Sequence, residues 1–289
     1  MTTPAAAVRL RVLSLGAGVQ STTLLLMALD GEIERPDCAI FADTGWEPTA
    51  VYRHFAWLRE SGELRGLPIH RVSVGNIRED ILGSVGGGKV SVAQAPFFVK
   101  GDLVDAKGRP ERGRLWRKCT RTYKIEPVIA FIRQHCLGLQ KGQRVPPGVR
   151  VEQWLGISKD EEHRQRDSRD AWIDLRYPLV ERGVTRQDCI DWLTMHGYPI
   201  PPKSSCIGCP FHSNEYWLDM RNTRPAEWAD ATGFDEGIRH GLPMVNGEAF
   251  LHASMVPLRD IDLRSPYERG VLTLWDQEMA AECEGVCGT

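Results

Sequence analysis

The clearest indication of the fold is the segment Ser14-Leu15-Gly16-Ala17-Gly18-Val19-Gln20-Ser21-Thr22, a run of small and hydroxyl-bearing residues. An apolar segment typical of a buried strand precedes it (8–13), and the apolar first turns of a helix follow it (22–29). A loop of this composition between a strand and a helix lets backbone N–H groups close on phosphate oxygens, and the helix N-terminus adds favourable partial charge. The same glycine pattern is also compatible with a dinucleotide-binding turn or with a tight turn that binds nothing.

Strands and helices alternate along the next part of the chain. A second strand is predicted at 38–42 and is followed by a helix at 48–60, and a third strand is predicted at 69–74. Later segments predict a helix at 124–135, a strand at 151–157 and a helix at 185–196. This alternation predicts an α/β fold with a doubly wound parallel sheet and right-handed crossovers.

The domain organisation follows from changes in composition. A proline-rich stretch at 199–202 is the best candidate boundary, so we predict a nucleotide-binding α/β domain at 1–200. A smaller, mainly helical, cysteine-containing segment is predicted at 201–289. Between 83 and 114 the periodicity is lost and glycines are dense, which predicts a long loop or lid.

Composition restricts the class of protein. The 289 residues carry a formal charge of −2, which argues against a protein that coats nucleic acid but leaves room for a local basic patch. No apolar run reaches the roughly 18 residues of a membrane span, and no secretory signal pattern is present at the start. We therefore expect a cytoplasmic protein, in which eight cysteines indicate metal, iron–sulfur or thiol chemistry rather than disulfides.

A second motif gives the glycine loop a context. The segment Asp43-Thr44-Gly45 follows the second predicted strand. Together with a Ser-x-Gly loop that closes on Ser21, it resembles the PP-loop ATP pyrophosphatases (adenine nucleotide alpha hydrolase-like), a superfamily that includes the phosphoadenosine-phosphosulfate (PAPS) reductases. The usual PP-loop is shorter, and it commonly has an acidic residue where this chain has Gln20.

The resemblance implies a Rossmann-like fold that binds ATP and Mg²⁺. It places the glycines close to the pyrophosphate and the hydroxyls of Ser14, Ser21 and Thr22 as donors to it, while Asp43 binds ribose or magnesium. The cofactor-binding residues that it implies in these two motifs are Ser14, Gly16, Gly18, Gln20, Ser21, Thr22, Asp43, Thr44 and Gly45. A helix-capping carboxylate is the alternative role for Asp43.

A third segment extends the predicted nucleotide site. Gly156-Ile157-Ser158-Lys159 follows a predicted strand and resembles a segment that lines the nucleotide site in these enzymes, with Ser158 in place of the usual Arg. We assign Gly156 and Lys159 to the nucleotide on this resemblance. An exposed, charged helix start is the alternative.

The most unusual stretch is basic and contains one cysteine. Arg117, Lys118, Arg121 and Lys124 surround Cys119, and nearby cations lower the pKa of a thiol, which favours the thiolate that metal binding and nucleophilic attack require. The same four cations suit a substrate phosphate or a nucleic-acid backbone. The pattern Cys-Thr-x-x-x-Lys-Ile-x-Pro resembles a segment of sulfurtransferases in DNA phosphorothioation and tRNA thiolation. That resemblance implies that Cys119 binds an iron–sulfur cluster.

A Cys-x-x-Cys pair supplies two further thiols. Cys206 and Cys209 lie within reach of one metal centre, and Gly208 permits the tight turn between them. With Cys119 they give three ligands for a 4Fe-4S cluster, as in the thiolation enzymes that the chain resembles. The alternatives are a structural zinc bound by Cys206, Cys209, Cys283 and Cys287, a redox dithiol, or no function.

The last residues carry two more thiols, Cys283 and Cys287. Terminal thiols can deliver sulfur or electrons, and this tail loosely resembles the catalytic Glu-Cys-Gly end of the reductases. Either thiol can also serve as a fourth cluster ligand. We predict catalytic roles for Cys119, Cys283 and Cys287.

The resemblance leads to one main expectation and two alternatives. The first is an ATP-dependent, AMP-forming sulfurtransferase whose partners are ATP, a sulfur donor and an acceptor such as tRNA, DNA or a small molecule, in a possible homodimer. The second is a PAPS reductase-like enzyme with a terminal cysteine as nucleophile. The third is a zinc-stabilised module that binds a nucleotide or nucleic acid.

Overall fold

The computed structural model describes residues 8–87, 95–104, 110–243 and 245–264. Its centre is a parallel sheet with the strand order β3-β2-β1-β6-β7. The strands are β1 (Val8–Leu15), β2 (Cys38–Ala42), β3 (Ile69–Val72), β6 (Arg150–Leu155) and β7 (Ile173–Arg176). Every pair in this sheet is parallel, which confirms the predicted α/β class.

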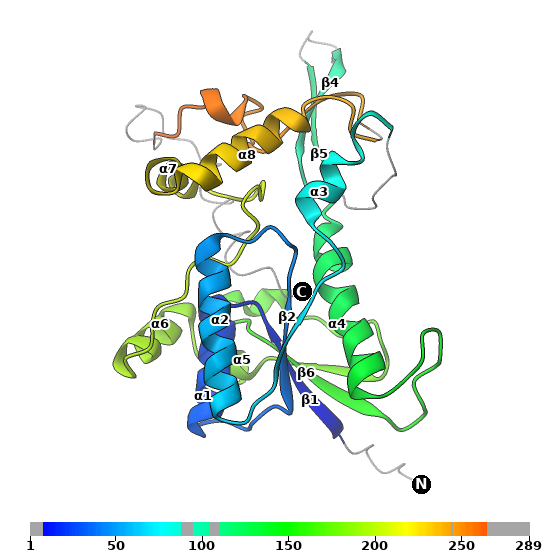
Figure 1. Ribbon diagram of the computed structural model, residues 1–289, viewed down its shortest axis with the longest axis vertical. Helices are drawn as coiled ribbons and strands as arrows, with labels where there is room; N and C mark the ends of the chain where they lie inside the picture. Colours follow the sequence, from blue (N-terminus) through cyan, green and yellow to red (C-terminus); the bar gives the residue numbers. More distant parts are fainter. Residues whose placement is uncertain (1–7, 88–94, 105–109, 244, 265–289) are drawn as a thin grey trace.

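Helices cover both faces of the sheet (Figure 1). One face packs against α1 (Val19–Asp30), α2 (Thr49–Leu64) and α6 (Arg186–Met195) through a cluster that includes Leu13, Phe41 and Trp154. The other face packs against α4 (Glu126–Phe131) through a cluster that includes Val12 and Ile132. Alternate strand residues thus face opposite helix layers, as in a doubly wound fold. The short helix α5 (Pro178–Glu181) follows β7.

The helix that contains α4 begins earlier than the sequence predicts. It runs through η2 (Arg121–Ile125), α4 and η3 (Ile132–Cys136) without a break in helical backbone angles at the junctions. Helical structure begins at Cys119, two residues before η2. This helix therefore connects the predicted cluster ligand to the face of the sheet.

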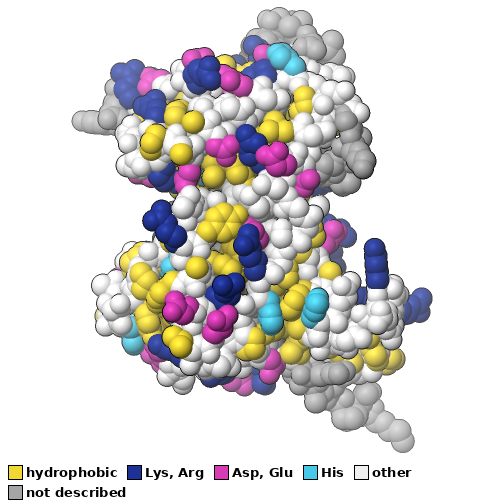
Figure 2. All heavy atoms as spheres, in the orientation of Figure 1, with side chains coloured by type: hydrophobic (Ala, Val, Ile, Leu, Met, Phe, Trp, Pro, Cys, Tyr) yellow, Lys and Arg dark blue, Asp and Glu magenta, His cyan; other side chains and the backbone are white. Residues whose placement is uncertain are grey.

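A second hydrophobic core lies outside the sheet. It includes Ile81, Phe97, Tyr123, Trp217 and Phe234. The helices and turns around this core are α3 (Ile77–Leu82), η1 (Val85–Gly87), α7 (Asn214–Thr223), α8 (Pro225–Gly237) and η5 (Leu258–Asp260). We call this part the helical lobe and the part around the sheet the sheet lobe; Figure 2 shows a constriction between them. The helical lobe combines residues from before and after the predicted boundary at residue 200.

The predicted loop at 83–114 contains two strands. Within it, β4 (Phe98–Val104) pairs antiparallel with β5 (Pro110–Arg114) and with β8 (Gly247–Phe250). The loop prediction is wrong for these residues. The partner strand β8 lies about 150 positions further along the chain, and a local pattern cannot reveal such a distant pairing.

Across the described residues, no helix is both long enough and apolar enough to span a membrane.

Candidate functional site

The glycine loop lies at the centre of the sheet, between β1 and α1. The neighbours of β1 are β2 on one side and β6 on the other, so the order of strands reverses at β1. Ligands of open α/β sheets bind at the carboxyl ends of the strands where this reversal occurs. The position of the loop therefore matches the nucleotide site that the sequence predicts.

The loop holds its shape through its own hydrogen bonds. The backbone N–H of Gly16 donates to Ser21 Oγ at 3.1 Å, and Ser21 Oγ donates to the carbonyl of Gly18 at 3.4 Å. Ala17 has a φ of 56°, in the left-handed region. Gly18 is the N-cap of α1 and provides no side-chain cap. The N–H groups in the first turn of α1 have no partner within the helix, which suits an anionic ligand.

Gly156 packs directly on this loop. A Cβ atom at Gly156 would lie 2.8 Å from the backbone nitrogen of Ser21, so a larger residue would displace the start of α1. Lys159, in contrast, begins the short helix η4 (Lys159–Arg164), and its side chain is exposed and forms an ion pair with Glu162. The structure thus brings Gly156 to the loop and places the Lys159 ammonium at the surface.

Two other predicted loop residues have structural partners. Thr22 is fully buried, and its hydroxyl lies 3.1 Å from His54 Nε2 on α2. The Thr22 hydroxyl thus contacts a residue of another helix, whereas the sequence predicts that it donates to a phosphate. Gln20 is also buried and donates to Glu161 Oε2 at 3.2 Å, which ties α1 to η4.

A cavity of about 400 Å³ opens beside the loop, and we call it the loop cavity. Gln153 Nε2 donates to Ser14 Oγ at 2.7 Å at its polar side. Its lining also includes Gly16, Ile40, Ala42, Lys124 and Val128. Apolar side chains beside an amide and a hydroxyl form a surface that suits the ring of a base.

Asp43 is engaged within the protein. The carboxylate is buried and accepts hydrogen bonds from the Gly45 N–H and the Tyr52 hydroxyl, both at 2.9 Å, and from Arg71 Nε at 2.8 Å. The Gly45 N–H belongs to the loop before α2, whose N-cap is Pro48, so the carboxylate stabilises a turn and does not cap a helix as the alternative role requires. Binding of ribose or magnesium by Asp43 stays a prediction.

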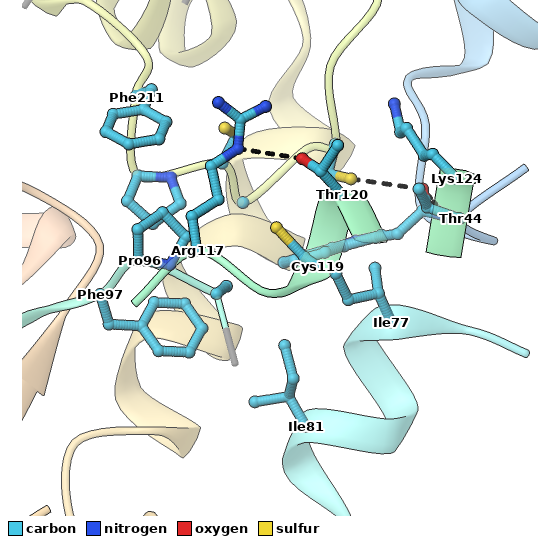
Figure 3. Close-up of a pocket in the computed structure, with 16 residues that line it drawn as sticks. Thr44, Ile77, Ile81, Pro96, Phe97, Arg117, Cys119, Thr120, Lys124 and Phe211 are labelled. Atoms are coloured by element: carbon cyan, nitrogen blue, oxygen red, sulfur yellow. Dashed lines mark hydrogen bonds between the residues drawn. The ribbon is translucent and has the colours of Figure 1, made fainter. Parts of the chain in front are cut away.

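The three predicted cluster ligands line one cavity, which we call the thiol cavity (Figure 3). It has about 650 Å³ of empty space, which includes open solvent at its mouth. Cys119 comes from the start of the helix that contains α4, whereas Cys206 and Cys209 come from the turn before α7. The remaining lining is mainly apolar and includes Trp46, Ile77, Ile81, Phe97, Pro210 and Phe211.

A chain of buried polar contacts connects the thiol cavity to the sheet lobe. Thr44 Oγ1 lies 3.2 Å from Cys206 Sγ and donates to Glu47 Oε1 at 3.2 Å. The same Glu47 oxygen accepts from Lys124 Nζ at 3.5 Å. Thr44, Glu47 and Lys124 are all buried. Thr44 therefore contacts a thiol rather than lining the loop cavity.

Lys124 lines both the loop cavity and the thiol cavity. Its charge is balanced by Glu47, and both side chains are less than 10% exposed. A buried ammonium between the two cavities is placed to attract negative charge from either side. The four predicted phosphate-binding cations divide accordingly: Lys124 is buried, Arg117 lines the thiol cavity, and Lys118 and Arg121 are exposed.

Arg117 and Arg121 also have protein partners. Arg117 Nε donates to Thr120 Oγ1 at 3.0 Å, and its guanidinium lies 5.6 Å from the ring centre of Phe211 (Figure 3). Arg121 pairs with Glu126 at 2.8 Å on the surface. Arg117 and Lys124 are thus the two cations of this group that line the thiol cavity.

Trp46 holds the two lobes together at the site. Its backbone carbonyl accepts from the Ile207 N–H at 2.9 Å, and its indole N–H donates to Asp230 on α8 at 2.5 Å. Gly208 lies flat against the indole, since a Cβ at this position would fall 2.1 Å from the ring. The Cys-x-x-Cys turn therefore packs against Trp46, the residue directly after the Asp43-Thr44-Gly45 motif.

Replacing Gly208 with alanine is expected to destabilise the protein by about 1–3 kcal/mol, because the new methyl group overlaps with Trp46. Urea unfolding at neutral pH measures this change. Gly233→Ala is the matched control, since Gly233 lies in α8 with open space around its Cβ position and alanine favours the helix. Equal stability of the two variants would contradict the close packing.

His212 lies near the cysteine turn but bonds to its backbone. Its Nε2 atom lies 2.9 Å from the carbonyl oxygen of Cys206 and 3.2 Å from that of Ile207. Burial lowers the pKa of His212 to about 3, so the ring is neutral at physiological pH. This histidine shapes the turn through its hydrogen bonds.

Two predicted catalytic residues, Cys283 and Cys287, lie outside the described residues. Among the residues that are described, no group of three or more His, Cys, Asp or Glu side chains is arranged to hold a single metal ion. The assignment of Cys119, Cys206 and Cys209 as ligands therefore rests on their shared cavity and on the chemistry of three thiols.

Comparisons with known proteins relate the fold to two solved structures. The chain is similar to a phosphoadenylyl-sulfate (PAPS) reductase from Candida auris in a phosphate complex, with 14% identity and a TM-score of 0.40 over 69% of this chain and 76% of that one. It is also similar to the U34-tRNA thiolase NcsA from Methanococcus maripaludis with its 4Fe-4S cluster, with 11% identity and a TM-score of 0.37 over 84% and 80%. No protein-family model and no curated protein matches the sequence. Both are similarities of fold alone.

Sequence reasoning missed the role of Glu47. This residue follows the Asp43-Thr44-Gly45 motif by two positions. Its only local signal was a carboxylate directly before Pro48. Its partner Lys124 is 77 positions away. The pairing becomes visible only when the helix that contains α4 packs across the end of β2.

Proposed function

We propose that this protein is an ATP-dependent sulfurtransferase that adenylates an acceptor and then replaces the activated oxygen with sulfur. One observation carries the proposal: a single buried residue, Lys124, lines both the cavity at the glycine loop and the cavity that holds three thiols. A nucleotide at the loop and an acceptor near the thiols would meet at this residue.

The reaction needs both cavities. A carbonyl oxygen by itself is a poor leaving group, so the acceptor must first be activated. The acceptor oxygen attacks the α-phosphorus of ATP, and pyrophosphate leaves. Sulfide from a donor then attacks the acceptor carbon, and the original oxygen departs with AMP. The ammonium of Lys124 stabilises the negative charge that develops on the α-phosphate.

The thiols provide the donor set for a 4Fe-4S cluster. Cysteine thiolates are the usual ligands of such clusters, and Cys119, Cys206 and Cys209 converge on one cavity from two parts of the chain. The cations Arg117 and Lys124 lie in the same lining. A cluster bound there by three thiols would leave one iron open for the sulfur that enters the product.

The lining of the thiol cavity favours a flat, uncharged acceptor group. Trp46, Phe97 and Phe211 supply aromatic surface, and most of the remaining lining is aliphatic. A nucleobase or a small heterocycle fits such a surface. The parent molecule can be tRNA, DNA or a small molecule, and we expect the enzyme to act in the cytoplasm, where thiols remain reduced.

Anaerobic purification followed by metal analysis and an AMP assay tests the proposal. We expect about four irons and four sulfides per chain, and release of AMP and pyrophosphate from ATP in the presence of sulfide and an acceptor. Bulk tRNA, double-stranded DNA and free nucleobases serve as the trial acceptors. Sulfite release from an adenylylated sulfate without ATP would instead identify a reductase, and zinc without iron would identify a nucleotide- or nucleic-acid-binding module.

A further inference from the structure

Two adjacent hydroxyl groups before the cysteine turn are buried without a hydrogen-bond partner among the described residues. They are the Oγ atoms of Ser204 and Ser205. Ser205 as a whole is only 1% exposed. A buried hydroxyl without a partner destabilises the folded state, so proteins rarely keep one unless another molecule satisfies it.

The position of Ser204 indicates what that molecule is. A Cβ atom on Gly18 would lie 3.7 Å from the Cβ of Ser204, so this serine contacts the glycine loop although it lies 186 positions away. Gly18 is the N-cap of α1, a helix of 12 residues, and leaves the N–H groups of its first turn uncapped by any side chain. The helix start favours an anion, and Ser204 brings a hydroxyl donor to this side of the loop.

The arrangement also indicates which phosphates reach the serines. Gly16 belongs to the lining of the loop cavity, whereas Gly18 and Ser204 do not. A base and ribose in the loop cavity would therefore direct the far end of the phosphate chain toward Gly18. Ser204 lies beside Gly18, and Ser205 directly precedes Cys206.

We propose that Ser204 and Ser205 form a subsite for the terminal phosphates of the nucleoside triphosphate, the pair that leaves as pyrophosphate. This inference rests on the ATP binding of the proposed function and adds a contribution from the second half of the chain. The hydroxyls donate to phosphate oxygens that the first turn of α1 also binds. Because Ser205 directly precedes Cys206, bound triphosphate holds the cysteine turn against the glycine loop.

Calorimetric titration with MgATP and with AMP tests the subsite in the full-length protein. Ser204→Ala, Ser205→Ala and the double variant are compared with wild type, and Ser254→Ala is the control, since that hydroxyl already pairs with His252 at 2.9 Å. We expect the dissociation constant for MgATP to rise about tenfold per hydroxyl lost, since a hydrogen bond to a charged group is worth about 1.5–3 kcal/mol. The constant for AMP should change less than about twofold, because AMP lacks the terminal phosphates.

Thermal unfolding provides the second readout. Without nucleotide the double variant should be at least as stable as wild type, because it no longer buries two unsatisfied hydroxyls. Its stabilisation by MgATP should be smaller than that of wild type. Equal MgATP affinity in all variants, or equal losses for MgATP and AMP, would overturn the subsite. Failure of wild type to bind MgATP would instead overturn the proposed function.

Discussion

Replacing Cys206 with alanine is expected to remove most of the iron from the anaerobically purified protein and to abolish sulfur transfer. Cys206 lines the thiol cavity with Cys119 and Cys209, and its sulfur lies 3.2 Å from the Thr44 hydroxyl. Loss of one of three protein ligands leaves a cluster with two, which does not hold the remaining irons in place. Iron and sulfide analysis together with the ultraviolet–visible spectrum measures the loss.

Two variants separate ligation from packing. Cys189→Ala removes a thiol that is fully buried in α6 against the sheet, where burial raises its pKa to about 12, so iron content should stay at the wild-type value. Thr44→Val removes the hydroxyl that contacts Cys206 and keeps the thiol, so most iron should remain. A normal iron content in Cys206→Ala would exclude this residue as a ligand.

Lys124→Met is expected to lower kcat/KM for AMP formation by about 100-fold or more, the effect typical of removing a charge stabiliser from a water-poor site. The lysine lines both cavities, so no other described cation takes its place in the shared wall. Steady-state release of AMP and pyrophosphate measures the change. Lys141→Met, at an exposed position, should leave the rate unchanged.

The same substitution leaves Glu47 buried without its cation. Removal of one partner from a buried ion pair destabilises a protein by about 3–5 kcal/mol, so urea unfolding should show this loss for Lys124→Met. The double variant Lys124→Met/Glu47→Gln removes both charges and should recover most of the stability without recovering activity. Full activity in the double variant would mean that Lys124 only balances the charge of Glu47.

Local sequence patterns predict the elements of the sheet lobe. Strands with continuous apolar runs, helices with apolar periodicity and a glycine-rich loop between β1 and α1 are local signals, because each depends on residues within a few positions of one another. The resemblance carried by Asp43-Thr44-Gly45 and by the Cys-x-x-Cys pair then pointed to nucleotide and thiol chemistry. The structure places Cys119, Cys206 and Cys209 in the lining of one cavity, and their role as cluster ligands stays a prediction.

The way in which these motifs meet depends on contacts between distant parts of the chain. The pairing of β4 with β8, the ion pair between Lys124 and Glu47, and the contact of Ser204 with Gly18 join residues far apart in the chain. Such contacts depend on how the second core packs against the first, and no short window of sequence contains both partners. The physical reason is that local patterns fix which face of an element is buried, whereas the identity of the opposite surface is set by the packing of the whole chain.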